Sequence, residues 1–150
     1  MHIYAVDLLD PYVKRFKIRE FDARILAQNK TNKLIEKIFE TQKNVIISSQ
    51  SLPTKLDQYK NKIDWLYCVP KYPCTLNELD FSKLTFFNGF SNHCQNIMAP
   101  LNAAILGADI IEIHITIDKK HNFVDNNVSF DPDELKQLTS YISLSKKIKT

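Results

Sequence analysis

Glycine is scarce in this sequence, with 2 residues among 150. Loops that hold phosphate groups with backbone N–H donors need several glycines at fixed spacing. Neither the dinucleotide-binding GxGxxG pattern nor the Walker A pattern can be written in this chain, and both nucleotide-binding classes are therefore excluded.

Long apolar runs and strong charge are missing as well. No stretch approaches the roughly 18 apolar residues of a membrane-spanning helix. Residues 1–7 do not place an apolar run behind a basic region, so we expect neither a signal peptide nor a membrane anchor. Lys and Arg number 20 against 17 Asp and Glu, a net charge of +3 that is spread along the chain. We therefore do not expect a nucleic-acid partner.

The 3 cysteines, Cys68, Cys74 and Cys94, include no CxxC pair. An odd number without that spacing argues against a disulfide framework and a thiolate zinc site, so we expect reduced thiols in the cytoplasm. The sequence is 44% hydrophobic and 25% charged, which is typical of a soluble globular protein. Without a repeat or a linker, residues 1–150 are predicted to form one domain.

Short apolar runs alternate with stretches of helical periodicity. Strands are predicted at residues 3–6, 16–18, 45–47, 65–69, 85–87 and 110–117, and one helical turn at 76–79. Helices are predicted at 31–41, at 97–106 with Gly107 as C-cap, and at 133–147 behind Asp131 and Pro132. This alternation predicts an α/β fold with parallel strands and right-handed crossovers.

The stretch at 110–117 has an unusual polar face. Side chains alternate along a strand, so the isoleucines 111, 113, 115 and 117 share one face and Glu112, His114, Thr116 and Asp118 share the other. Such a row must be paired, solvated or functional, because burying unpaired charge is costly. An edge strand with one wet face is the ordinary alternative. The helical patterns on either side favour an interior strand.

A second polar cluster at residues 88–93 would place His93 beside His114 at the carboxyl ends of neighbouring strands. Two imidazoles with carboxylate and water nearby suit Mn²⁺, and suit zinc less well because zinc prefers three or four protein ligands. Hydrogen-bonded structural histidines are the commoner case. We expect His2 and His121 to be ordinary surface residues.

Four blocks of the second half then share a pattern with one family. They are residues 89–94 (GFSNHC), 103–108 (AAILGA), 111–116 (IEIHIT) and 125–135 (DNNVSFDPDEL). In order and spacing they resemble motifs of the sialic acid synthase family, which makes N-acetylneuraminate, legionaminate and pseudaminate. Residues 16–18 (FKI), 41–49 (TQKNVIISS) and 67–73 (YCVPKYP) resemble further family segments less closely.

The resemblance implies an incomplete TIM-type (β/α)8 barrel, with the strands of this chain as the third through the eighth. A full barrel needs about 250 residues. The first two strands and the family's antifreeze-like domain have no counterpart in the sequence. The resemblance therefore also implies a homo-oligomer or a complementary N-terminal fragment as partner.

The implied reaction joins C3 of phosphoenolpyruvate to the aldehyde of an N-acetylated mannosamine-type sugar, after which water attacks C2 and phosphate leaves. By resemblance, His93 and His114 bind Mn²⁺ or Mg²⁺, which polarises the aldehyde oxygen. The same resemblance makes Glu112 and His114 catalytic, assigns Lys17 and Ser91 to phosphoenolpyruvate, and assigns Tyr72 and Asp125 to the sugar. Without the motifs, each of these four binding residues has an ordinary reading as a solvated, capping, packing or turn residue.

The chain also departs from the family pattern. The altered positions are Glu20, Pro70, Asn92, Cys94, Asn96, Ile113, Ile115 and Asn126. Pro70 has no N–H to donate to phosphate, and the charge of Glu20 would repel it. These departures favour a second hypothesis, a non-catalytic remnant or one piece of a split barrel that binds sugar, metal or a subunit. A third is a different metal-dependent aldolase that reuses His93, Glu112 and His114.

Overall fold

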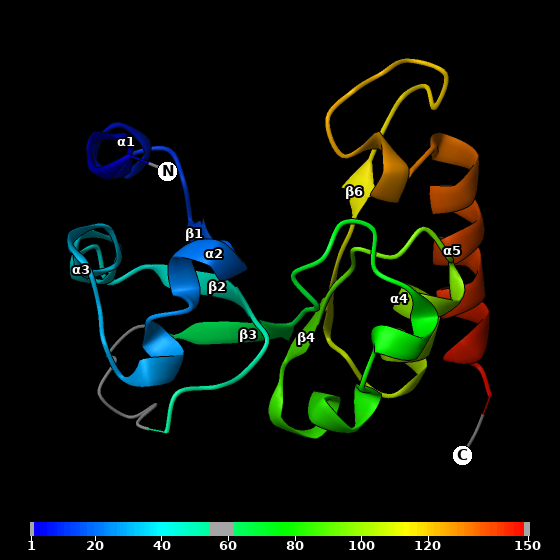
Figure 1. The fold of residues 1–150 in the computed structure, drawn as a ribbon, viewed down its shortest axis with the longest axis horizontal. Helices are drawn as coiled ribbons and strands as arrows, with labels where there is room; N and C mark the ends of the chain where they lie inside the picture. Colours follow the sequence, from blue (N-terminus) through cyan, green and yellow to red (C-terminus); the bar gives the residue numbers. More distant parts are fainter. Residues whose placement is uncertain (1, 55–61, 149–150) are drawn as a thin grey trace. The chain divides into compact units, whose positions relative to one another are not determined.

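The computed structural model describes residues 2–54 and 62–148. The chain divides into two compact units, Met1–Trp65 and Leu66–Thr150. Both contain helices and strands (Figure 1). No helix among the residues described is long and apolar enough to cross a membrane.

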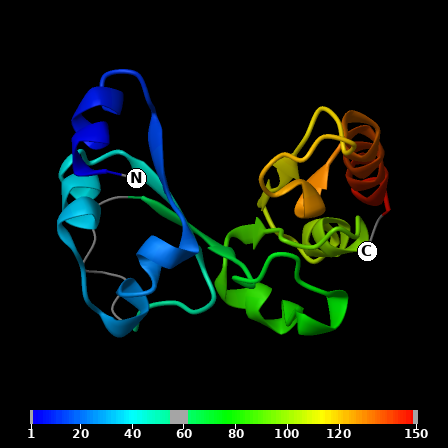
Figure 2. The same ribbon diagram turned by 45° about the horizontal axis from the view of Figure 1, so that its top comes forward.

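Among its described residues, the first unit contains four helical segments and two complete strands. They are α1 (Ile3–Leu9), β1 (Arg15–Ile18), α2 (Glu20–Ala23), η1 (Leu26–Gln28), α3 (Lys33–Glu40) and β2 (Asn44–Ser49), followed by the start of β3 (Ile63–Tyr67). Strands β1 and β2 are parallel, with Phe16 opposite Val45. Helices α1 and α3 lie side by side (Figure 2).

The pattern of α3 explains how this unit forms its core. The Asn32 side chain accepts a hydrogen bond from the N–H of Ile35, which caps the helix. Ile35 and Ile38, three residues apart, are fully buried, as are Val45 and Ile47 of β2. A helix with one apolar stripe therefore shares a buried core with β2.

The second unit begins with the end of β3 and continues through four strands and several helical segments. These are η3 (Leu76–Glu78), η4 (Phe81–Phe86), β4 (Gly89–Ser91), α4 (Met98–Ile105), β5 (Ile110–Glu112), β6 (His114–Ile115), η5 (Asn126–Val128), β7 (Ser129–Phe130) and α5 (Pro132–Ser145). Strand β4 pairs in parallel with β3 and with β5, and β6 pairs in parallel with β7.

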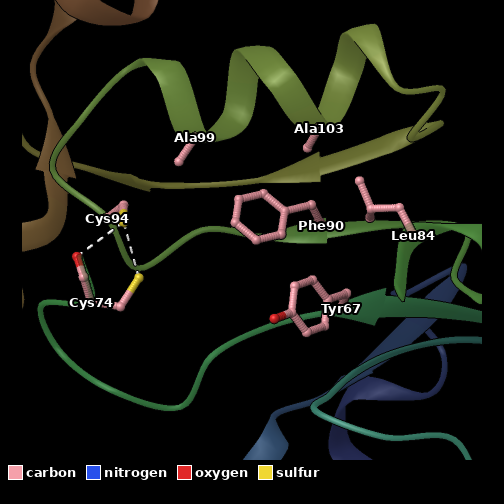
Figure 3. Packing of buried hydrophobic residues seen from close by; sticks show 7 residues of the cluster. All are labelled: Tyr67, Cys74, Leu84, Phe90, Cys94, Ala99 and Ala103. Atoms are coloured by element: carbon pink, nitrogen blue, oxygen red, sulfur yellow. Dashed lines mark hydrogen bonds between the residues drawn. The ribbon is translucent and has the colours of Figure 1, made fainter. Parts of the chain in front are cut away.

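The core of this unit is a cluster around Phe90, which is drawn in Figure 3. Tyr67 of β3 lies on one side of Phe90, and Ala99 and Ala103 of α4 lie on the other. The two alanines are fully buried. Their small side chains let α4 lie close to the strand that holds the aromatic ring.

Most of the predicted elements are confirmed. The helices predicted at 31–41, 97–106 and 133–147 correspond to α3, α4 and α5, and Asp131 caps α5 through its bond from Glu134 N. Gly107 follows α4 with φ of 98°. Strands 16–18 and 45–47 are present and the pairs are parallel. The turn at 76–79 is η3.

Four predicted strands need correction, and three of them are short. Residues 3–6 are helical. This apolar run is too short for hydrophobic periodicity to distinguish a helix from a strand. Residues 85–87 belong mainly to η4, because the Asp80 side chain caps a 3₁₀ helix there, and the strand begins only at Gly89. The strand predicted at 65–69 ends at Tyr67.

The long strand predicted at 110–117 is broken at Ile113 into β5 and β6. Its predicted apolar face does not stay buried, since Ile115 is 67% exposed and Ile117 is 85% exposed. The cause is a change of partner, because β6 pairs with β7 and the N–H of Thr116 donates to the Phe130 carbonyl. Thr116 takes the buried position instead.

Gly89 gives a test of this packing. A Cβ at Gly89 would lie 2.1 Å from the Ile110 carbonyl oxygen and 2.8 Å from Leu66 Cδ2, whereas one at Gly107 would meet nothing within 4 Å. We expect Gly89→Ala to lower the free energy of unfolding by at least about 3 kcal/mol. Gly107→Ala, strained only by its positive φ, should cost about 1–2 kcal/mol. Urea unfolding followed by circular dichroism measures both, and equal losses would contradict the predicted close approach.

Candidate active site

His93 lies just beyond β4 and is held by a backbone carbonyl. It is 5% exposed, and its Nδ1 lies 2.6 Å from the Val69 carbonyl oxygen. A carbonyl can only accept, so Nδ1 bears the proton. In the neutral ring, Nε2 is then the nitrogen that keeps a lone pair.

Tyr72 lies directly against this ring. The two ring centroids are 4.0 Å apart with the planes stacked at 29°. The Tyr72 hydroxyl is 2.7 Å from His93 Nε2. Because Nδ1 is the protonated nitrogen, the hydroxyl donates this hydrogen bond and Nε2 accepts it.

His114 opens β6 and completes a group of three rings. Its centroid is 5.7 Å from that of His93 and 5.5 Å from that of Tyr72, the latter in an edge-to-face arrangement. Asp125 Oδ2 lies 3.7 Å from His114 Nδ1, beyond hydrogen-bond distance. Asp125 itself has a left-handed backbone with φ of 61° and precedes η5.

Ser91 and Glu112 stand at the ends of β4 and β5, directly opposite each other in the parallel register. Ser91 is buried and Glu112 is half-buried. His93 and His114 each come two residues later in the chain. The carboxyl ends of these strands therefore bring together Ser91, His93, Glu112 and His114, as the sequence predicted.

Lys17 lies in the first unit, on β1. Its Nζ donates to the Ser48 hydroxyl at 2.8 Å and contacts the Ile18 carbonyl at 3.4 Å. Ser48 is buried at the end of β2 and was not singled out from the sequence. In the observed parallel register Ile18 is opposite Ile47, and Ser48 is the next residue. Ser48 therefore lies at the end of β2 that is near Lys17.

Thr116 and Asp118, the last two residues of the predicted polar face, have a structural role. Thr116 Oγ1 contacts the Asp118 carbonyl at 3.3 Å, and the Asp118 carboxylate accepts from Lys120 N at 2.7 Å. The other carboxylate oxygen of Asp118 lies 2.9 Å from His121 Nδ1. Thr116 and Asp118 therefore organise the turn after β6. His2 and His121 are exposed, as predicted.

Backbone contacts hold the segments that bear Tyr72 and His93 together. Cys74 N–H donates to the His93 carbonyl at 2.9 Å, and the Cys94 thiol donates to the Cys74 carbonyl at 3.0 Å. Burial raises the pKa of the Cys94 thiol to about 12 and also raises the pKa of Cys74. Both thiols are therefore protonated at neutral pH, and all three cysteine side chains are buried.

A polar turn anchors the loop after Tyr72. Lys71 Nζ lies 2.5 Å from Glu78 Oε1, and Glu78 Oε2 accepts from the backbone and hydroxyl of Thr75, each at 2.8 Å. The hydrogen bond from Lys71, followed by those from Thr75, lowers the pKa of Glu78 to about 2. Glu78 is exposed and stays ionised at neutral pH.

The two histidines fit a divalent metal as a partial ligand set. Within residues 2–54 and 62–148, no group of three or more His, Cys, Asp or Glu side chains is placed to hold a metal ion. The bond from His93 Nδ1 to a carbonyl is the second-shell contact that commonly orients a ligating histidine. Two protein nitrogens would leave the remaining positions to substrate and water.

All 150 residues match the family model described as the NeuB family. The chain belongs to the NeuB family. An uncharacterized protein of Methanocaldococcus jannaschii is 30% identical over 160 residues, covering 95% of this chain and 46% of that protein. The N,N'-diacetyllegionaminic acid synthase of Campylobacter jejuni is 29% identical over 157 residues, covering 92% of this chain and 45% of the synthase.

A solved structure shares the fold of this NeuB-family chain. The N-acetylneuraminic acid synthetase of Leptospira borgpetersenii serovar Hardjo-bovis, in complex with citrate, matches with a TM-score of 0.85. The match covers 98% of this chain and 55% of the synthetase at 24% identity. The chain thus spans about half the length of the relatives described here.

Asn92 is one of the departures from the family pattern, and its contacts show why an amide suits this position. It is 1% exposed, its Nδ2 donates to the Cys94 carbonyl at 2.8 Å, and its Oδ1 accepts from Cys94 N at 3.1 Å. An aspartate keeps the second bond but places an oxygen against the carbonyl.

We therefore expect Asn92→Asp to lower the free energy of unfolding by about 1–3 kcal/mol, because a buried acceptor loses its donor. The matched control is Asn96→Asp, since exposed Asn96 only accepts, from Met98 N at 2.9 Å. The control should stay within about 0.5 kcal/mol of the native chain. Chemical denaturation measures both, and an unchanged midpoint for Asn92→Asp would refute a structural role for this amide.

Proposed function

We propose that this chain supplies the metal-binding part of an enzyme that condenses phosphoenolpyruvate with an N-acetylated mannosamine-type sugar in polysaccharide biosynthesis, in the cytoplasm. The observation that supports this most directly is the meeting of His93 and His114 beside Tyr72 in a chain of the NeuB family. In this proposal the strands correspond to the third through the eighth of a TIM-type barrel.

The proposed metal is Mn²⁺, with Mg²⁺ as the alternative, held by His93 and His114. When bound, such a metal supplies Lewis-acid polarisation of the sugar aldehyde. Imidazole nitrogens with oxygen ligands from substrate and water suit either ion better than an all-protein zinc site. The orientation of His93 by the Val69 carbonyl supports the pair as ligands.

The remaining roles follow from residue chemistry. Lys17, bonded to Ser48, has the point charge for a phosphate group, and buried Ser91 has a hydroxyl donor for phosphoenolpyruvate. Glu112, opposite Ser91, is the proposed catalytic carboxylate next to the reacting carbons. Tyr72 and Asp125, which both lie near His114, are the proposed sugar contacts.

The chain spans about half the length of its relatives, and we propose that groups outside residues 1–150 complete the site. In this proposal they come from another copy of this chain or from an N-terminal fragment that contains the first two strands of the family's barrel. Those strands would provide a further phosphate-binding lysine and an acidic residue, as the family resemblance implies.

A non-catalytic binding protein is the second candidate, and Pro70 favours it. Proline has no N–H to offer a phosphate, and it sits between the Val69 carbonyl and the Lys71 N–H, which are joined by a 2.8 Å hydrogen bond. Glu20 is weaker evidence for a non-catalytic protein, because its carboxylate accepts a hydrogen bond from Arg24 Nε at 2.9 Å and its charge is partly neutralised.

Manganese binding tests the proposed metal site. Electron paramagnetic resonance should show Mn²⁺ bound to the native chain, with affinity at least about tenfold weaker in the His93→Ala/His114→Ala double variant, because both nitrogen ligands are gone. The His2→Ala/His121→Ala double variant, which removes two exposed imidazoles, should bind as the native chain does. Absence of binding to the native chain would contradict the metal site.

Phosphate release tests the proposed reaction separately. With phosphoenolpyruvate, N-acetylmannosamine and Mn²⁺, we expect release only when an N-terminal fragment of a NeuB-family synthase is also supplied. Glu112→Gln should abolish that release while leaving Mn²⁺ affinity close to native. Retained manganese binding without release under any of these conditions would favour the non-catalytic candidate.

A further inference from the structure

The contact between Tyr72 and His93 involves the nitrogen that a metal would need. His93 Nδ1 is committed to the Val69 carbonyl at 2.6 Å, so Nε2 is the nitrogen left for a ligand. The Tyr72 hydroxyl lies 2.7 Å from that atom. One lone pair on Nε2 cannot accept a phenolic proton and bind a cation at the same time.

We propose that Tyr72 is a displaceable cap on the metal-binding nitrogen of His93. The proposal rests on the metal site of the proposed function and deepens it. A divalent cation that binds His93 must first break the hydroxyl contact, so the measured metal affinity includes the cost of removing the cap.

The position of the tyrosine ring favours a cap over a random surface contact. The ring is stacked on His93 at 4.0 Å and meets His114 edge-on at 5.5 Å. One side chain therefore covers both proposed ligands at once.

The backbone around Tyr72 is fixed, while its side chain has room to leave. Cys74 N–H is bonded to the His93 carbonyl, and Lys71 is bonded to Glu78. Tyr72 itself is 52% exposed. Rotation of the side chain toward solvent, with the loop staying in place, is the motion that uncaps Nε2.

Uncapping would also change what the hydroxyl can bind. With the cation on Nε2, the hydrogen bond from the Tyr72 hydroxyl to His93 is broken, and the hydroxyl can turn toward a polar group of the sugar. The cap thereby couples metal loading to the sugar contact proposed for the same residue, so that the tyrosine is released for substrate only after the metal is bound.

The test compares Tyr72→Phe with the native chain. Phenylalanine keeps the stacked ring and removes only the hydroxyl. A neutral hydrogen bond that competes with the metal should weaken its binding by roughly twofold to tenfold, so Tyr72→Phe should bind Mn²⁺ that much more tightly. The readout is Mn²⁺ affinity by electron paramagnetic resonance at one fixed pH, which does not depend on turnover.

Tyr141→Phe is the matched control. Tyr141 is also partly exposed, at 41%, and its hydroxyl accepts one hydrogen bond from Gln137 at 3.0 Å, on helix α5. This control should bind Mn²⁺ with native affinity. Thermal unfolding of both variants establishes that each is folded before its affinity is compared.

Each outcome separates the cap from the metal site. Tighter binding by Tyr72→Phe alone supports the cap. Equal affinity overturns the cap and leaves the metal site intact, and weaker binding overturns it by making the hydroxyl a ligand. If neither protein binds Mn²⁺, the cap and the metal site both fail, since removing the hydroxyl should have exposed the nitrogen.

Discussion

The close approach of β4 to β5 at Gly89 is the constraint on which the proposed site depends. A side chain at this position would overlap the Ile110 carbonyl, so only glycine lets β4 lie between β3 and β5 in the observed register. That register sets Ser91 opposite Glu112 and determines where the chain leaves the strand toward His93. The chain has 2 glycines, and one of them therefore fixes the positions of Ser91 and Glu112 in the proposed site.

Beyond the strand ends, the order of the site comes from the backbone. The Val69 carbonyl sets the tautomer of His93, the His93 carbonyl holds the loop after Tyr72, and the Asn92 amide bonds both backbone groups of Cys94. Each of these bonds joins residues that lie outside the named helices and strands of the structure. Backbone groups thus set the orientation of the His93 imidazole and of the loop that bears Tyr72.

The sequence predicted the meeting of His93 and His114 better than it predicted the strands around them. His93 and His114 could be paired from the polar face of one strand and the motif block of another, because the carboxyl ends of parallel strands meet at one edge. The break at Ile113 could not be seen, since alternation continues unbroken in the sequence while the pairing partner changes from β4 to β7. The hydrogen bond from Tyr72 to His93 could not be predicted from the sequence either, because it depends on the path of a loop and loops have no hydrophobic periodicity.

The contacts of the residues that depart from the family pattern show that these departures differ in their effect on the proposed site. Asn92 satisfies both of its amide groups locally, and Glu20 is paired with Arg24, so neither change has to disturb substrate binding. Pro70 is different, because the missing N–H cannot be replaced by a side-chain rotation. None of these changes removes a nitrogen from the histidine pair. The proposed metal ligands are therefore unaffected by these changes, and Pro70 is the departure that bears most directly on the choice between the proposed enzyme and the proposed binding protein.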